Sequence, residues 1–240
     1  MESVEYVGKC LLINSGERRI LAVGDLHLGW EENLNRSGVL VSRQMFEEMI
    51  EYFDKVFGEV GRVEDIVLLG DVKHRFGSIM KQEWSDALGL FDYLKDKCEK
   101  IVIVKGNHDA VLEPIVKQRS NVFLMNYYAC GKWLFMHGNR DFAESYNKEI
   151  KNWVVGHGHP AIKISEPGGS KIEKFKCFLV GKWKDKNVII VPSFFDASGG
   201  SDPRENDLGL AWKFKLEKFN VKVVSDGMLE VLDFGKLKEL

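Results

Sequence analysis

The chain lacks the sequence features of membrane-spanning and exported proteins. No run of apolar residues is long enough to cross a bilayer, which excludes a helical membrane protein. The first ten residues alternate polar and apolar side chains, so they lack the basic and then apolar layout of a signal peptide. We therefore expect a protein that works without a membrane.

Closely spaced cysteine pairs are also absent. The four cysteines form no C-x-x-C pair, which argues against a zinc ribbon or a redox motif. A chain of 240 residues does not depend on a disulfide framework. We therefore expect a cytoplasmic protein with thiols at Cys10, Cys98, Cys130 and Cys177.

An excess of charge of one sign is missing as well. The 34 basic and 36 acidic residues nearly cancel, so the overall charge gives no argument for nucleic-acid binding, and only a local basic patch would supply one. The composition is instead that of a globular protein with a core, because 45% of the residues are apolar. The length suits a single domain spanning residues 1–240.

Strand and helix patterns alternate in the first part of the chain. Compact apolar runs predict buried strands at residues 19–23, 65–69 and 101–104. Apolar residues at helical spacing predict helices at residues 41–57, with Ser42 as the N-cap, and at residues 79–98. This β-α-β-α-β order then gives way to a strand-rich half.

The strand-rich half has one short predicted helix, at residues 144–151. Strands are predicted at residues 122–128, 133–136, 153–155, 161–164, 175–180 and 188–191. Two more strands, at residues 221–224 and 228–232, would form a hairpin around Asp226-Gly227. Loops are predicted at residues 167–169 and 198–201.

All six histidines lie in five short segments that also carry glycine, acidic or amide residues. These segments are Gly24-Asp25-Leu26-His27, Gly70-Asp71-Val72-Lys73-His74, Gly106-Asn107-His108-Asp109, Met136-His137-Gly138 and Gly156-His157-Gly158-His159. Four of them follow an apolar run directly, and Lys105 separates the fifth from its run. Since neighbouring strands bring their exit loops together, the five segments can meet in space.

The residue types in these segments suit metal chemistry. Imidazole and carboxylate groups bind Mn²⁺, Fe or Zn²⁺, and the absence of cysteine argues against a thiolate site. A carboxylate between histidine clusters can bridge two metals ~3.5–4 Å apart, the spacing typical of two-metal hydrolysis. Such a pair clamps a phosphoryl group and lowers the pKa of a bridging water. Glycine before the ligands allows unusual backbone angles and a close approach.

The five segments resemble the signature of the calcineurin-like metallophosphoesterase superfamily, which reads D-x-H, G-D, G-N-H-D/E, H and G-H-x-H. The match runs in order through residues 25–159. The short chain and residues 70–76 further resemble archaeal phosphoesterases related to the SbcD repair nuclease. The resemblance implies an α/β fold: a four-layer α-β-β-α sandwich of two mixed sheets, with the motifs in loops along one edge.

The resemblance also implies a dinuclear site for two divalent metal ions, with manganese expected and iron, zinc or nickel as alternatives. One metal would bind Asp25, His27 and His159, and the other would bind Asn107, His137 and His157. Asp71 would bridge the two metals. His108 would lie off the metals and donate a proton to the leaving group or bind the phosphate.

One position departs from the phosphatase branch of this superfamily. His74 stands where an aspartate three residues after the bridging aspartate would orient the catalytic histidine. Two alternatives follow: Asp109 orients His108, or His74 itself touches the phosphate. Arg140 is a candidate phosphate contact by its charge, with a surface ion pair as the alternative. Phe194 and Phe195 are expected to pack near the site, and base stacking is the alternative.

These observations predict a two-metal phosphoesterase that hydrolyses a phosphodiester, in nucleic acid or a nucleotide, by means of a metal-activated water. A phosphomonoesterase acting on a small phosphorylated molecule is the first alternative. A non-catalytic scaffold is the second, although a scaffold is expected to lose ligands and here every expected ligand is present. A metallopeptidase is weaker still, because the chain has no H-E-x-x-H motif.

Overall fold

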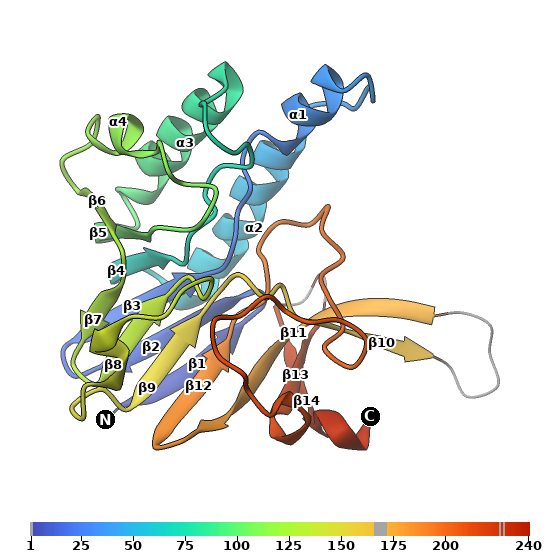
Figure 1. The fold of residues 1–240 in the computed structure, drawn as a ribbon. Coiled ribbons are helices and arrows are strands. Elements are labelled where there is room, and N and C mark those ends of the chain that lie inside the picture. The colour runs from blue at the N-terminus through green and yellow to red at the C-terminus, as the bar shows by residue number, and fades with distance from the viewer. Residues whose placement is uncertain (1, 166–171, 226, 228) are drawn as a thin grey trace.

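The computed structural model describes residues 2–165, 172–225, 227 and 229–240. Its strands form two sheets that are stacked face to face (Figure 1). The predicted loop at residues 167–169 and Asp226 of the predicted hairpin turn lie outside the described residues. The strands on either side of that turn do pair antiparallel.

The first sheet has six strands in their sequence order. Its strands are β1 (Ser3–Val7), β2 (Cys10–Ser15), β3 (Arg18–Val23), β4 (Val63–Leu68), β5 (Cys98–Val104) and β6 (Val122–Met125). Strands β1–β2 and β2–β3 pair antiparallel, whereas β3 to β6 run parallel to one another. The sheet is therefore mixed, with its parallel part buried on both faces.

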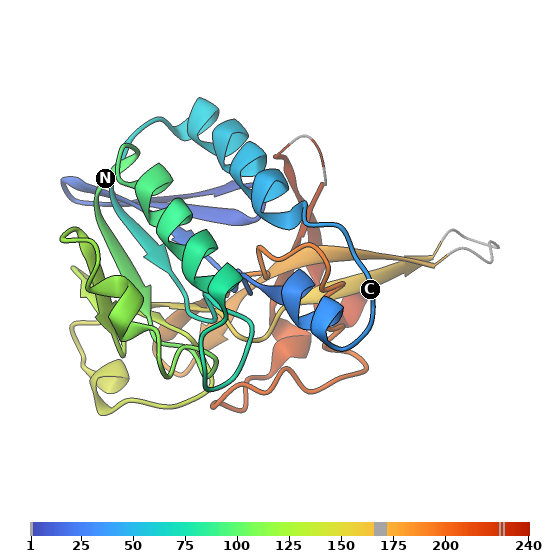
Figure 2. The same ribbon diagram turned by 90° about the horizontal axis from the view of Figure 1, so that it is seen from above.

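The second sheet is ordered β14-β13-β11-β12-β9-β8-β7, and β10 pairs with β11. Its strands are β7 (Tyr128–Cys130), β8 (Trp133–Met136), β9 (Asn152–Val155), β10 (Ala161–Ser165), β11 (Ile172–Trp183), β12 (Lys186–Ile190), β13 (Asn220–Val224) and β14 (Val231–Lys236). Strands β8, β9 and β12 are parallel and the other pairs are antiparallel. Strand β10 and the start of β11 extend from the body as an arm (Figures 1 and 2).

Helices cover the outer face of the first sheet (Figure 2). The helices are α1 (Trp30–Arg36), α2 (Met45–Val60), α3 (Lys81–Leu94) and α4 (Glu113–Val116). Helix α2 buries the apolar side chains on one of its faces, from Met49 and Phe53 to Val60, against the strands. A second apolar layer, which includes Phe135, Val154 and Phe178, fills the space between the sheets.

The outer face of the second sheet is covered differently. Trp153 and Leu179 of this face pack against Leu208 and Trp212 of an irregular segment. Three 3₁₀ turns complete the cover: η1 (Ala143–Tyr146), η2 (Leu216–Lys218) and η3 (Leu237–Glu239). The predicted α/β architecture of two mixed sheets with helices outside is confirmed, and among the described residues the fourth layer consists of loops and 3₁₀ turns.

Some predicted boundaries are wrong for physical reasons. Helix α2 begins at Met45 with Gln44 as its N-cap, so Ser42 is not the cap. The Glu31 carboxylate accepts hydrogen bonds from the Gln44 and Met45 amides, at 2.7 and 3.0 Å, and so satisfies amides that a cap would serve. The strand predicted at residues 122–128 is divided between β6 and β7, which belong to different sheets. The predicted helix at residues 144–151 is reduced to the 3₁₀ turn η1.

Candidate metal centre

Five loops at the carboxyl ends of parallel strands carry the site. Three of them follow β3, β4 and β5, which are neighbours in the first sheet. The other two follow β8 and β9, which are neighbours in the second sheet. The His157 main-chain amide donates to both carboxylate oxygens of Asp25, at 3.2 and 3.1 Å, so the loops of the two sheets are in direct contact. The predicted convergence of the five segments is therefore what the fold produces.

Four of the predicted ligands have left-handed backbone conformations, which side-chain-bearing residues rarely adopt. Their φ angles are 49° at His27, 48° at Asp71, 64° at His157 and 42° at His159. The His27 amide donates to the Asp71 carbonyl at 2.9 Å, so the loops after β3 and β4 stabilise each other in this conformation. Such strain costs ~1–3 kcal/mol per residue and is concentrated at functional sites.

Two glycines allow the loops to come this close. A Cβ atom at Gly106 would lie 2.2 Å from Asp71 Oδ1. A Cβ atom at Gly70 would lie 2.6 Å from His137 Nδ1, and Gly70 also has a positive φ of 96°. Both distances are shorter than a side chain tolerates, so these positions require glycine.

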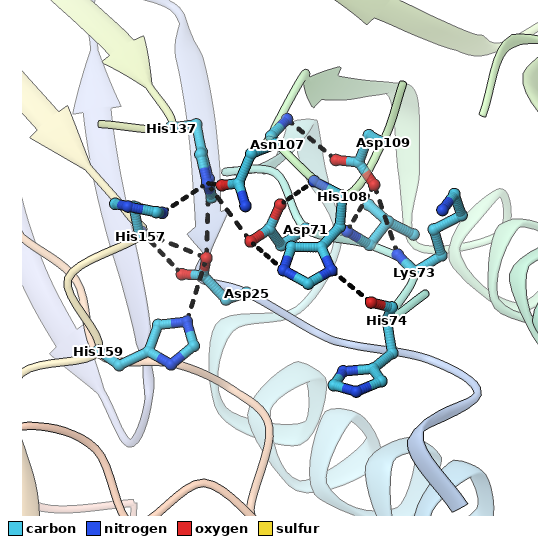
Figure 3. A network of polar contacts seen from close by, with 12 residues as sticks. Asp25, Asp71, Lys73, His74, Asn107, His108, Asp109, His137, His157 and His159 are labelled. Carbon is cyan, nitrogen blue, oxygen red and sulfur yellow. Dashed lines mark hydrogen bonds and ion pairs between the residues drawn. The ribbon is translucent and has the colours of Figure 1, made fainter. Parts of the chain in front are cut away.

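Asp25, His27 and His159 form the first group of potential ligands. Each offers one ligand atom, and the three atoms lie within 4.8 Å of one another. His159 Nε2 is 3.3 Å from Asp25 Oδ1 (Figure 3). Asp25 and His27 are buried, so these donors face inward rather than toward bulk water. This group is the set expected for the first metal.

Asp71, His137 and His157 form the second group, again with ligand atoms within 4.8 Å of one another. His137 Nε2 lies 3.0 Å from His157 Nδ1 and 3.5 Å from Asp71 Oδ2. Asn107 Oδ1 joins the group at 3.0 Å from His137 Nε2 (Figure 3). Asp71 also belongs to a third group, with His27 and His108, so its carboxylate lies between the two sets of ligands.

The His137 ring shows why a cation fits the second group. Its Nδ1 lies 2.7 Å from the Leu69 carbonyl oxygen, which only accepts, so Nδ1 carries a proton. Burial lowers the pKa of His137, but its hydrogen bond with Asp71 and the charges of Asp25 and Asp71 outweigh burial and raise that pKa to about 9. Nε2 therefore also carries a proton, which it directs at Asn107 Oδ1, and a metal ion bound at Nε2 would take the place of that proton. A metal-binding histidine typically donates its other ring N–H to a carbonyl, as His137 does.

The electrostatics of the two groups favour the ionised carboxylates. Burial alone would raise the pKa of Asp25, but His159 and His137 outweigh it and hold that pKa well below its usual range. Burial also opposes ionisation of Asp71, whose pKa is nevertheless lowered by its hydrogen bond with His137. Burial lowers the pKa of His27 to about 3, so its ring stays neutral. Ionised carboxylates and neutral imidazoles are the forms that bind metals.

His108 lies beside the two groups, and its main-chain amide donates to Asp71 Oδ1 at 2.9 Å. The His108 ring donates from Nδ1 to the main-chain carbonyl of His74, and its Nε2 lies 3.7 Å from Asp71 Oδ2 (Figure 3). The idea that Asp109 orients His108 needs correction, because the contact to the His108 ring comes from the main chain of His74. The His74 ring itself lies at the site, 5.4 Å from the His27 ring.

Asp109 has a different position from the one expected of a catalytic partner. It is fully buried, and its two oxygens accept hydrogen bonds from the Val72 and Gly106 amides, both at 3.0 Å. These amides belong to the loops that carry Asp71 and Asn107. Asp109 therefore ties the two loops together. Burial and the charge of Asp71 raise the pKa of Asp109 to about 6.

Comparison with known proteins identifies the family. A family model described as calcineurin-like phosphoesterase matches residues 18–225, which include every segment of the site. The chain belongs to the calcineurin-like phosphoesterase family. A solved structure of the nuclease MPE from Pseudomonas putida has a similar fold, with a TM-score of 0.61 and 16% identity over 98% of this chain and 100% of that chain. None of the curated proteins matches this sequence.

Membership of the calcineurin-like phosphoesterase family makes the chain a metal-dependent hydrolase of phosphoester bonds. Among the described residues, no helix has both the length and the apolar character needed to cross a bilayer. Arg140 is exposed in the loop after β8. The Phe195 ring lies 5.5 Å from the His27 ring, and Phe194 stacks on Phe53 of the core, so both aromatic residues pack as expected.

Sequence reasoning missed three residues of this calcineurin-like site. Ser193 Oγ donates to the Asp25 carbonyl at 3.0 Å and so supports the first group of ligands. Phe76 packs on His108 with 3.7 Å between ring centroids, although 62% of its surface remains exposed. Lys73 is fully buried, and its main-chain amide lies 3.4 Å from Asp109 Oδ1. A lysine next to a motif aspartate was visible in the sequence, whereas the contacts of Ser193 and Phe76 depend on tertiary structure.

Proposed function

We propose that this protein is a phosphodiesterase that uses two divalent metal ions to hydrolyse a phosphodiester bond in nucleic acid or a nucleotide. One observation carries the proposal. Two groups of ligand atoms lie on either side of the Asp71 carboxylate, and His108, which belongs to neither of these two groups, lies within reach of Asp71 and His27. A non-catalytic scaffold would not need that histidine or a complete ligand set.

The residues would divide between the metals as follows. Asp25, His27 and His159 would hold the first ion, Asn107, His137 and His157 the second, and Asp71 would bind both. When bound, such ions polarise the phosphoryl oxygens and supply an activated water as the nucleophile. The donors are nitrogen and oxygen atoms without a thiolate, which supports manganese, with iron, zinc and nickel to be tested beside it.

His108 would move a proton at its Nε2 atom. The hydrogen bond from Nδ1 to the His74 carbonyl fixes the orientation of the ring and leaves Nε2 on the side of Asp71. From Nε2 a proton can be donated to the oxygen of the leaving group. The carbonyl thus orients the His108 ring, as a carboxylate orients the catalytic histidine in the phosphatase branch. A role of the His74 ring in touching the phosphate, and of Arg140 in binding it, is part of the proposal.

Preference for a diester over a monoester rests on two observations. The similar structure from Pseudomonas putida is named as a nuclease. In addition, the phosphatase branch pairs its catalytic histidine with an aspartate. Here a neutral main-chain carbonyl contacts His108 instead, so the chain departs from that branch. A monoesterase acting on a small phosphorylated molecule is the second candidate, and it has the same metal site. The four free cysteines support a reducing, cytoplasmic location.

A panel of substrates tests the proposal. The protein is treated with a chelator, reloaded with Mn²⁺, and assayed on bis-p-nitrophenyl phosphate, p-nitrophenyl phosphate, cyclic nucleotides and single-stranded DNA. We expect metal-dependent turnover, with the diester hydrolysed faster than the monoester. Faster hydrolysis of the monoester would establish the second candidate. Absence of turnover in a metal-loaded protein would contradict the enzyme altogether.

Substitution of the bridging carboxylate tests the metal roles. Asp71→Asn removes the charge that both ions would share, so we expect metal-dependent activity to be abolished. Asp96→Asn is the matched control, because Asp96 is exposed after α3, at the opposite end of the first sheet. Two bound metals and an activity near that of the wild type in Asp71→Asn would show that Asp71 is not the bridge.

A further inference from the structure

A cavity of about 360 Å³ next to the metal centre is lined by lysines. Lys9 lies in the turn between β1 and β2, Lys55 lies on α2, and Lys174 and Lys176 lie on β11. Among the described residues that line it, Asp196 is the one acidic residue, and four lysines against one carboxylate leave an excess of three positive charges. This lysine pocket is a local basic site in a chain whose overall charge is −2.

Two of these lysines are buried and hold the wall of the lysine pocket in place. The Lys9 amine is 1% exposed and bonds to the Phe194 carbonyl at 3.2 Å and to Asp196 Oδ1 at 2.6 Å. The Lys176 amine donates to the Ser193 carbonyl at 2.8 Å and lies 3.7 Å from Asp196. Buried amines need such partners. Both lysines therefore fix residues 193–196, the segment that also contacts Asp25.

The other two lysines have charge available for a ligand. Lys55 and Lys174 are both exposed, and the Lys174 amine donates to the Gly200 carbonyl at 3.0 Å. Within the described part of the chain, no carboxylate forms an ion pair with either of them. Two cationic side chains that face one cavity without a counter-charge favour an anion there. The ammonium group of lysine is a common partner of phosphate.

The lysine pocket and the metal centre share a wall. Ser198 lines the pocket, and its hydroxyl lies 3.5 Å from His159 Nδ1. Phe195, three residues before Ser198, lies against the ring of His27 in the metal centre. Figures 1 and 2 both show this segment after β12 between α2 and the arm formed by β10 and β11. A ligand that extends from the metals over Ser198 would therefore enter the lysine pocket.

We propose that the lysine pocket binds a backbone phosphate of a nucleic-acid strand, next to the phosphate that is hydrolysed at the metals. This inference rests on the proposed phosphodiesterase function and specifies its substrate. A molecule with a single phosphate would place that group at the metals and leave the lysine pocket without a partner. A nucleic-acid strand carries a charged phosphate at every nucleotide, so it can fill both positions.

The test compares substrates that differ only in additional phosphates. Wild-type protein and the double variant Lys55→Ala/Lys174→Ala are assayed on a thymidine dinucleotide with a single diester and on a thymidine hexanucleotide. We expect the ratio of kcat/KM for the hexanucleotide to that for the dinucleotide to fall about tenfold in the variant. The dependence of hexanucleotide binding on salt should also become shallower, by about 0.7 in the logarithmic slope for each phosphate that the lysines no longer neutralise.

Two further variants provide controls. Lys95→Ala/Lys148→Ala removes the same charge from exposed positions that precede β5 and β9, whose opposite ends carry the metal centre. We expect this control to keep the wild-type ratio. Lys55→Arg/Lys174→Arg keeps the charge and should restore most of the preference for the hexanucleotide. An equal loss on both substrates, or no loss in the alanine variant, would overturn the proposal.

Binding to the chelated protein separates this proposal from the proposed function. Fluorescence anisotropy of a labelled hexanucleotide measures binding without turnover. Weaker binding to Lys55→Ala/Lys174→Ala than to the lysine control supports the lysine pocket, even if the wild type hydrolyses neither substrate. If the wild type hydrolyses neither substrate but the variant binds more weakly, the proposed function is contradicted and phosphate binding by the lysine pocket is still supported. Equal binding to both variants overturns the pocket whatever the activity.

Discussion

At the residue scale, the proposed proton transfer by His108 depends on the contact between its ring and the main-chain carbonyl of His74. A carbonyl can orient a ring but carries no charge, unlike the carboxylate of the phosphatase branch. The Phe76 ring, packed on His108, adds a second constraint on the ring's position. The arrangement leaves Nε2 as the atom of His108 that can reach the substrate.

Replacing His108 tests this assignment. His108→Ala should lower turnover by about 10²- to 10⁴-fold, because a positioned proton donor contributes that much. Metal content, measured on the same protein by plasma mass spectrometry, should equal that of the wild type. His74→Ala keeps the carbonyl, so we expect a smaller loss of turnover. Loss of metal in His108→Ala would instead make His108 a ligand.

Much of the site could be predicted from the order of its motifs, and the rest could not. The seven expected ligands converge because each follows a strand, and strand exits can be recognised from the sequence. The partner of His108 is a backbone atom, so no side-chain pattern could reveal it. Asp109 looked like a catalytic partner by its place next to His108, yet its carboxylate is directed at the amides of two loops.

At the scale of elements, Asp109 is the group that positions the loops after β4 and β5. In Asp109→Asn the amide nitrogen cannot accept a hydrogen bond, so one loop amide is left without its partner. We expect metal affinity to fall about 10- to 100-fold, as for other groups that support metal ligands. A metal titration followed by calorimetry measures this, and circular dichroism checks that the fold is kept. An unchanged metal affinity would remove this positioning role.

A second buried carboxylate links the two sheets away from the site. Asp65 of β4 forms hydrogen bonds with the Arg18 side chain, at 2.8 and 2.6 Å, and with the Tyr128 hydroxyl of β7, at 2.8 Å. Burial on its own would raise the pKa of Asp65, but the hydrogen bonds from Arg18 and Tyr128 outweigh it and lower that pKa. The ionised form therefore stabilises the folded protein.

This lowered pKa gives a pH-dependent prediction. The stabilisation by Asp65 should be complete above the pKa of the unfolded chain, about 3.9, and should disappear as the pH falls through the lower pKa of the folded chain. Asp65→Asn should cost about 2 kcal/mol at pH 7. Urea unfolding at a series of pH values measures the difference, which should shrink below pH ~4. A constant difference, or one that Asp96→Asn also shows, would contradict the prediction.

Element boundaries show where local patterns are insufficient. The apolar run at residues 122–128 has the pattern of one strand, but its two ends pair with β5 and β8 in different sheets. A change of sheet is decided by tertiary packing, and the spacing of apolar residues does not predict it. The start of α2 is similar, because the amides there are satisfied by Glu31 from α1 rather than by a nearby cap.

At the scale of the whole molecule, the metal centre joins the two sheets. Asp25, His27, Asp71 and Asn107 follow strands of the first sheet, and His137, His157 and His159 follow strands of the second. The sequence predicted both sheets and their order of motifs. It did not predict that an irregular segment covers the outer face of the second sheet, because the apolar residues from Leu208 to Leu216 alternate as in a strand although this segment forms none.

Metal binding should therefore stabilise the whole fold. With free Mn²⁺ at about 100 times its Kd, binding to the folded state alone contributes about 2.7 kcal/mol per site. This corresponds to an increase in Tm of about 5–10 °C for a chain of this size. Differential scanning fluorimetry of the chelated and reloaded protein measures the increase, and His157→Ala should reduce it. An identical Tm with and without metal would show that the ions do not bind between the sheets.

The central claim is a dinuclear metal centre bridged by Asp71. A crystal of the protein grown with Mn²⁺, measured at the manganese absorption edge, tests it most directly through the anomalous difference map. We predict two peaks, one at Asp25, His27 and His159 and one at Asn107, His137 and His157, with the Asp71 carboxylate in contact with both. A single peak, or peaks away from these residues, would contradict the account.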